Sequence, residues 1–200
     1  MEKPFSQASE NNKEAIAITL EPYLRGVQRI LEIGSGTGQH AVYIGERYPA
    51  VTWQTSDVKA NHAGIETWVN EAGLPNVLLP VERNIESPAW EEAEQEAIYL
   101  ANVVHIIELH LVERLFRHLD ACLGADGLLF MYGPYNYGGR FTSDGNKRLD
   151  DWLKSLNPDF GIRDFEFIDD LARNAGLMLL EDCTMPANNR LLIWRRCKQN

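Results

Sequence analysis

A glycine-rich turn is the part of the sequence whose residue types are best suited to binding a small molecule. Three glycines spaced GxGxG, Gly34, Gly36 and Gly38, follow a short apolar run and precede a helical pattern. Glycines in such a turn allow a sharp change of direction and let a ligand approach the backbone closely. A dinucleotide-binding turn, GxGxxG, would need a glycine at position 39, which is Gln39. The spacing therefore disfavours a nicotinamide cofactor, and a turn needed only for packing is the structural alternative.

An acidic residue follows the next apolar run at a position that suits the same ligand. Asp57 lies 19 residues after Gly38, just past the run at residues 51–55. In a doubly wound fold, a carboxylate at this position can accept hydrogen bonds from both hydroxyls of a ribose. We therefore expect Asp57 to bind the ribose of a cofactor, and a solvated aspartate is the alternative.

Further polar side chains close two later apolar runs. Asn102 and His105 close the run at residues 97–104, and Tyr132 closes the run at residues 127–132. Ligands of open α/β sheets bind outside the carboxyl ends of the strands. Since histidine titrates near neutral pH, His105 is the first candidate for a catalytic base, with Tyr132 as the second. A histidine that only packs against its neighbours is the alternative.

Apolar runs and helical patterns alternate along the chain and predict the elements that position these residues. The expected strands lie at residues 27–33, 51–55, 76–81, 97–104, 127–132, 177–183 and 190–195. The expected helices lie at residues 13–24, 39–47, 65–72, 109–123, 146–156 and 164–175. This alternation predicts an α/β, Rossmann-like domain over residues 1–200, with a mostly parallel seven-stranded sheet, an antiparallel last strand and helices on both faces.

Three segments outside the regular elements could contact a substrate. The loop at residues 133–146 is long and rich in Gly, Tyr and Asn, and residues 1–25 form a leading helical cap. The turn MPANN at residues 185–189 would lie at the carboxyl end of a strand if the last two strands form a hairpin. The candidate acceptor-binding residues in these segments are Asn11, Tyr135, Asn136, Asn188 and Asn189. A self-packed loop, turn-forming asparagines and a helix cap are the alternatives.

Composition and charge narrow the classes of partner. The chain has 200 residues and a formal net charge of −10, which repels nucleic acid and anionic membranes and favours a small neutral or cationic acceptor. The number of cysteines, three, is odd. Neither the cysteines nor the His, Asp and Glu residues have the spacing of a metal site. We therefore expect reduced thiols, no metal and a cytoplasmic protein, an expectation that the lack of a leader pattern or a long apolar run supports.

The acid two positions before the first glycine adds to the pattern of the turn. Glu32 followed by GxGxG resembles the cofactor-binding motif of class I S-adenosylmethionine-dependent methyltransferases. In that family an aspartate facing the adenine amino group usually stands at the position of Asn84, whose amide oxygen can still accept that hydrogen bond or can sit in a turn. The resemblance implies S-adenosylmethionine as cofactor and S-adenosylhomocysteine as product. It places these residues at the cofactor: Glu32, Gly34, Ser35, Gly36, Gly38, Asp57, Asn84 and Asn102.

Longer segments resemble one branch of these enzymes, the methyltransferase-like protein twenty-six family of animals and its bacterial relatives. The segments are KPFSQASENN, LEIGSGTGQHAVYIGERYP, TWQTSD, ANVVHI, MYGPYNYGGRFTSDGN, GIRD and MPANN. The resemblance implies the fold and the cofactor more directly than a reaction, and with the net charge it favours methyl transfer to a small molecule. The acceptor, the methylated atom, the use of a base and the oligomeric state are left open. A protein that binds the cofactor as a sensor or scaffold, without turnover, is the second hypothesis.

Overall fold

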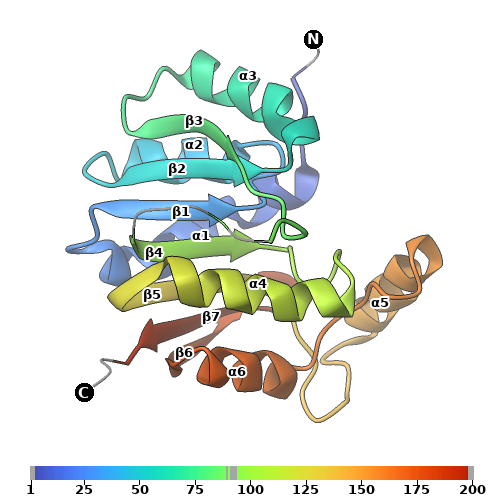
Figure 1. Ribbon diagram of the computed structural model, residues 1–200. Helices are drawn as coiled ribbons and strands as arrows, with labels where there is room; N and C mark the ends of the chain where they lie inside the picture. Colours follow the sequence, from blue (N-terminus) through green and yellow to red (C-terminus); the bar gives the residue numbers. More distant parts are fainter. Residues whose placement is uncertain (1–2, 89, 91–93, 198–200) are drawn as a thin grey trace.

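The computed structural model describes residues 3–88, 90 and 94–197, and one seven-stranded sheet organises them (Figure 1). The strands are β1 (Arg29–Ile33), β2 (Thr52–Asp57), β3 (Val77–Glu82), β4 (Gln95–Ala101), β5 (Leu123–Pro134), β6 (Leu177–Met185) and β7 (Asn189–Arg196). Their order is β3-β2-β1-β4-β5-β7-β6, and β7 runs antiparallel to both of its neighbours. The expected mostly parallel sheet with an antiparallel last strand is confirmed.

Helices cover both faces of this sheet. They are α1 (Gln7–Leu24), α2 (Gln39–Arg47), α3 (His62–Ala72), α4 (Leu109–Cys122), α5 (Asp144–Leu156) and α6 (Phe165–Asn174). The apolar faces of α1, α2 and α3 belong to one core cluster, and those of α4 and α6 belong to the other. Figure 1 shows α4 and α6 in front of the sheet, whereas α5 lies beyond the ends to which the parallel arrows point.

The side chains of the central strands alternate between the two cores. In β1, Ile30 packs against the cluster of α1 to α3, whereas the adjacent Leu31 packs against the cluster of α4 and α6. In β5, Phe130 and Met131 divide in the same way. Because both faces are buried, such strands need continuous apolar runs rather than an apolar-polar alternation. This requirement is the reason that the runs were recognisable in the sequence.

The structure corrects the bounds of two predicted elements near the site. Helix α1 begins at Gln7 rather than at residue 13, because the Ser6 hydroxyl accepts a hydrogen bond from the Ser9 N–H (3.2 Å) and caps the helix. Strand β4 ends at Ala101 rather than at residue 104, because Asn102 adopts a left-handed backbone conformation with φ of 58°. His105 therefore lies in a turn beyond β4 and not in the strand.

The loop predicted at residues 133–146 is shorter than expected at both ends. Strand β5 continues to Pro134, which pairs with Asn189 of β7, and α5 begins at Asp144, after the cap Ser143. The partner strand β7 supplies hydrogen bonds that the sequence of β5 alone does not reveal. As a result, the start of the predicted loop is part of the sheet.

We expect Asn76→Ala to lower the free energy of unfolding by about 2 kcal/mol, because it leaves buried carbonyl groups without a donor. The Asn76 amide donates to the carbonyl oxygens of Gly45 (2.9 Å) and Val51 (3.0 Å), and so joins α2 to the segment before β2. Urea denaturation measures the effect, with the exposed Asn70→Ala as the matched control. Equal stabilities of the two variants would contradict this role of Asn76.

Candidate functional site

The glycine-rich turn connects β1 to α2 in a geometry that two of its glycines require. A Cβ atom on Gly34 would lie 2.8 Å from the Val103 side chain, so no larger residue fits there. Gly36 has a φ of +59°, and no atom lies within 4 Å of the place where its Cβ would be. Gly34, Ser35, Gly36 and Thr37 line a cavity, whereas Gly38 packs against α3. The turn therefore presents bare backbone to the cavity.

Asp57, the last residue of β2, is joined to this turn. Its carboxylate accepts hydrogen bonds from the backbone N–H groups of Gly36 (2.8 Å) and Val58 (2.7 Å) and from the Asn61 amide (2.8 Å). An ionised carboxylate offers about four lone-pair sites, so one acceptor position remains. Asp57 also lines the cavity, as expected for a ribose-binding carboxylate.

Glu32 lies behind the turn and not in the cavity wall. Only 2% of its surface is exposed, and its carboxylate accepts hydrogen bonds from the Ser35 hydroxyl (2.8 Å) and the Trp53 indole N–H (3.0 Å). Burial raises the pKa of Glu32 to about 7, against the lowering effect of these two hydrogen bonds. The structure thus places Glu32 where it supports the turn from behind.

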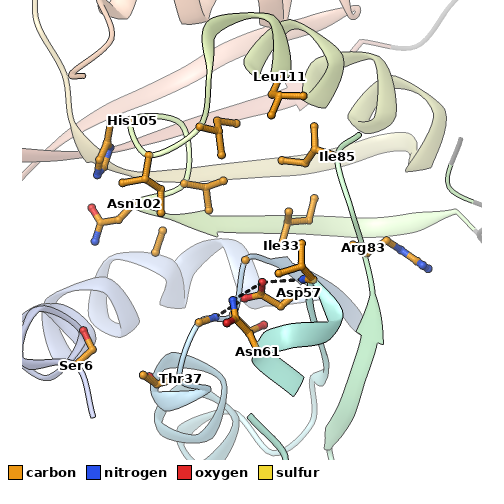
Figure 2. A pocket seen from close by; sticks show the side chains of 18 of the residues that line it. Ser6, Ile33, Thr37, Asp57, Asn61, Arg83, Ile85, Asn102, His105 and Leu111 are labelled. Carbon is orange, nitrogen blue, oxygen red and sulfur yellow. Dashed lines mark hydrogen bonds between the residues drawn. The ribbon is translucent and has the colours of Figure 1, made fainter. Parts of the chain in front are cut away.

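One cavity of about 860 Å³ brings the turn together with residues from several other elements (Figure 2). Asp57 and Asn61 lie on one side of it, and Asn102 and His105 lie on the opposite side. The apolar side chains of Ile33, Ile85 and Leu111 also line it. This volume is of the size that holds cofactors and small ligands in proteins.

The far wall carries the candidate base. His105 is 4% exposed, and its Nδ1 has no hydrogen-bond partner in the part of the chain that the structure describes. Burial, with the charge of nearby Arg163, lowers the pKa of His105 to about 4. The ring is therefore neutral at pH 7, and the lowered pKa makes it a weaker base than a free imidazole.

Asn84 and Asn102 both line the cavity, in different settings. The side-chain oxygen of Asn84 accepts a hydrogen bond from the Glu86 N–H (2.9 Å), which is the turn alternative considered from the sequence. Asn102 follows β4 directly, and its N–H donates to the Tyr132 carbonyl oxygen (2.8 Å). Its left-handed backbone is a conformation that costs free energy and is found preferentially at functional sites.

Tyr132, the second candidate for catalysis, does not line the cavity. It is 3% exposed, and its backbone pairs with Ala101 of β4 and Leu191 of β7 inside the sheet. Burial raises the pKa of Tyr132 above its ordinary value. Its side chain therefore belongs to the core cluster of α1 to α3 and not to the cavity wall.

The other residues expected to contact an acceptor also lie outside the cavity wall. Tyr135 is fully buried in the core of α4 and α6, and Asn136 is buried against the segment at residues 162–163. Asn11 and Asn188 are exposed and Asn189 is half-buried. The extension of β5 to Pro134 carries the following residues into the core, away from the mouth of the sheet.

The rest of the cavity wall includes residues that the sequence did not single out. Ile106 follows β4, Leu111 lies in the first turn of α4, and Asn157 and Phe160 follow α5. The segment after α5 has no strand before it, so the rule that ligands gather at strand ends does not point to it. Asn157 and Phe160 reach the cavity because α5 lies beyond the ends of the parallel strands (Figure 1).

The chain before α1 and the first turn of α1 also line the cavity, through Pro4, Ser6 and Ser9. The Trp68 indole donates to the Pro4 carbonyl oxygen (2.6 Å), and the Ser6 N–H donates to Gln39 Oε1 (2.6 Å). Lys3 lies 3.7 Å from the centre of the Trp68 ring. These contacts hold the leading segment against the start of α2 and against α3.

Within residues 3–88, 90 and 94–197, no group of three or more His, Cys, Asp and Glu side chains is arranged to hold a metal ion. No helix in those residues is long and apolar enough to cross a bilayer.

The pKa of Glu32 predicts a pH dependence of stability. Because burial raises this pKa from 4.5 to about 7, the folded protein holds the proton more tightly than the unfolded chain. The contribution of Glu32 is therefore complete below pH 4.5 and is lost as the pH rises through 7, a change of about 3 kcal/mol.

We expect Glu32→Gln to remove this contribution to the pH dependence, since glutamine stays neutral while keeping an acceptor for Ser35 or Trp53. Thermal or urea unfolding between pH 4.5 and 8 measures the difference from the unchanged protein, with the exposed Glu14→Gln as control. A difference that does not vary with pH would show that the Glu32 carboxyl titrates normally.

Comparison with known proteins gives a family and a set of similar folds. An O-methyltransferase family protein from Burkholderia thailandensis is similar over 94% of this chain, with a TM-score of 0.76 and 14% identity. The mitomycin 7-O-methyltransferase has a TM-score of 0.83 and 15% identity over 95% of this chain. An O-methyltransferase from neocarzinostatin biosynthesis, solved with S-adenosylmethionine and 2-hydroxy-5-methyl naphthoic acid, has a TM-score of 0.75 and 16% identity over 94%.

These similarities show a methyltransferase-type Rossmann-like fold. They show the fold alone, because sequence identities this low carry no information on the reaction. The chain spans 59%, 54% and 54% of the length of these three proteins, respectively. A protein-family match covers residues 3–196 and is described as a protein of unknown function. The chain therefore belongs to the DUF938 family.

Proposed function

We propose that this protein is an S-adenosylmethionine-dependent methyltransferase that acts on a small molecule and releases S-adenosylhomocysteine. The observation that supports it most strongly is the single cavity that unites the glycine-rich turn and Asp57 with Asn102 and His105. A cofactor site alone would suit a sensor or scaffold. The extension of the cavity past Asn102 to His105 and Phe160 leaves room for an acceptor and favours an enzyme.

The residues around the turn fit S-adenosylmethionine. The bare backbone at Gly36 allows the amino-acid part of the cofactor to approach, and the free acceptor position of Asp57 suits a ribose hydroxyl. Val58 and Ile85 line the cavity next to Asp57 and Asn84 and offer apolar contact to an adenine ring. Glu32 and Gly38 act indirectly, by supporting the turn and by packing it against α3.

When bound, the cofactor supplies an electrophilic methyl group on a sulfonium. The residues of the cavity need to hold the acceptor in line and exclude water. We assign His105 to take the proton that a hydroxyl or amine acceptor releases, because its uncharged ring lines the cavity. We assign no direct role to Tyr132, because it lies in the core cluster of α1 to α3 and outside the cavity wall.

The acceptor side of the cavity suits a small, largely apolar molecule. Its lining includes Ile106, Leu111 and Phe160, with Glu108 as a nearby charge. This charge and the net charge of −10 disfavour an anionic acceptor. A protein of similar fold was solved with apigenin, a small aromatic molecule that carries no carboxylate. The cytoplasmic location, the single-domain organisation and the narrower resemblance to the twenty-six branch stay predictions.

Calorimetric titration with S-adenosylmethionine, S-adenosylhomocysteine and NADH tests the cofactor. We expect the first two to bind in the micromolar range and NADH not to bind. Asp57→Asn should weaken binding of S-adenosylhomocysteine by about tenfold to a hundredfold, through loss of charged hydrogen bonds. The exposed Asp144→Asn is the matched control. Binding of NADH alone would overturn the proposal, and an unchanged affinity of Asp57→Asn would remove Asp57 from the ribose site.

Turnover tests the catalytic half of the site. We expect a radiolabelled methyl group to pass from S-adenosylmethionine to at least one member of a panel of phenols and aromatic amines. His105→Gln should lower that rate about a hundredfold or more, because a general base is lost, with the cofactor affinity changed less than about twofold. The exposed His110→Gln is the control. A rate that His105→Gln leaves intact would exclude His105 as the base.

A further inference from the structure

The turn that carries His105 has little support of its own. Residues 102–108 contain no helix or strand, and the internal backbone hydrogen bond runs from the Ile106 N–H to the Val103 carbonyl oxygen (3.1 Å). The Nδ1 atom of His105 has no hydrogen-bond partner among the described residues. The position of the imidazole in the cavity wall therefore depends on what holds the backbone of the turn.

A distant segment, residues 161–163, holds this backbone at three carbonyl groups. The Gly161 N–H donates to the His105 carbonyl oxygen (3.0 Å). The Arg163 guanidinium donates from Nε to the Val104 carbonyl oxygen (3.1 Å) and from Nη2 to the Ile107 carbonyl oxygen (2.7 Å). The two Arg163 bonds hold the residue before His105 and the second residue after it, and they come from a side chain that does not line the cavity.

The segment is itself firmly placed. The Ile162 N–H donates to the carboxylate of Asp150 (2.8 Å), which is 2% exposed and pairs with Lys154 (2.6 Å). Arg163 also donates from Nη2 to the Asp159 carbonyl oxygen (2.7 Å). Its own carbonyl oxygen accepts from the Asn136 N–H (3.0 Å) in the chain after β5. The GIRD segment thus ties the turn after β4 to α5 and to the chain after β5.

We propose that Arg163 is the positioning residue for His105, holding the turn of residues 104–107 so that the imidazole faces the acceptor. This role rests on the proposed function of the cavity. A planar guanidinium carries five N–H donors in a rigid fork, so it can bond carbonyl groups that lie in different directions at once. A lysine at this position has a single nitrogen and cannot reproduce the set.

Arg163 has a second effect, through its charge, on the pKa of His105. Glu108 lies in the turn, Asp150 and Lys154 lie on α5, and Asp159 and Arg163 lie in the segment that follows. Of these, Arg163 lowers the pKa of His105, and burial lowers it more. Loss of the guanidinium should therefore raise the pH at which the ring titrates, both by removing the charge and by loosening the burial.

Nuclear magnetic resonance of histidine-labelled protein tests the proposal without any acceptor or cofactor. His105→Gln assigns the ring signals. In the unchanged protein, the His105 ring should stay neutral down to about pH 5. In Arg163→Gln, its signals should shift, and its titration should move up by about one pH unit or more. The exposed Arg148→Gln on α5 should leave both features unchanged.

Arg163→Lys keeps the proposal testable if Arg163→Gln does not fold. This variant retains the positive charge but not the planar set of N–H donors. The ring signals of His105 should therefore shift, but its titration should change less than in Arg163→Gln. Affinity for S-adenosylhomocysteine should stay within about twofold in both variants, because Arg163 lies outside the cavity wall. Ring signals and titration identical to those of the unchanged protein would overturn the role of Arg163. Failure of the unchanged protein to bind the cofactor would instead overturn the proposed function alone.

Discussion

The hydrogen bond between the Gly36 N–H and the Asp57 carboxylate is the interaction on which the geometry of the cavity depends. It joins the turn after β1 to the last residue of β2, so that backbone and carboxylate face the same space. Glu32 and Ser35 support the turn from behind through a second, buried set of bonds. The bond forms only if the glycine at position 36 adopts its left-handed conformation, which other residues resist.

The two sides of the cavity are held by different means. The side at Asp57 belongs to the sheet and inherits the rigidity of adjacent parallel strands, since β1 and β2 pair residue by residue up to Ser56. The side at His105 lies beyond the end of β4 and depends on hydrogen bonds from Arg163 and Gly161, which are far away in the sequence. One wall of the cavity is thus built on paired strands, and the other is a turn held by hydrogen bonds from a distant segment. In such a site the second wall can change in sequence without disturbing the first.

A buried polar set beneath the sheet's carboxyl edge connects α1 to this site. His40 of α2 lines the cavity, and its Nε2 lies 2.6 Å from the side-chain oxygen of Asn12 of α1. The hydroxyl of Tyr99 of β4 lies 3.4 Å from the other ring nitrogen of His40. Buried polar groups need hydrogen-bond partners, so these contacts help to fix how α1 packs against α2 and β4.

The sequence by itself determined the strands, the two helical layers and the side of the cavity at the glycine-rich turn. Apolar runs mark strands buried on both faces, and Gly34, Gly36 and Asp57 lie next to strand ends that parallel pairing brings together. Tertiary structure decided the side that we propose for the acceptor. Tyr135 was expected there and is instead buried, because pairing with β7 extends β5, whereas Asn157 and Phe160 reach the cavity through the placement of α5. Local patterns report each residue's own strand or helix, but contacts between distant segments depend on how those elements pack.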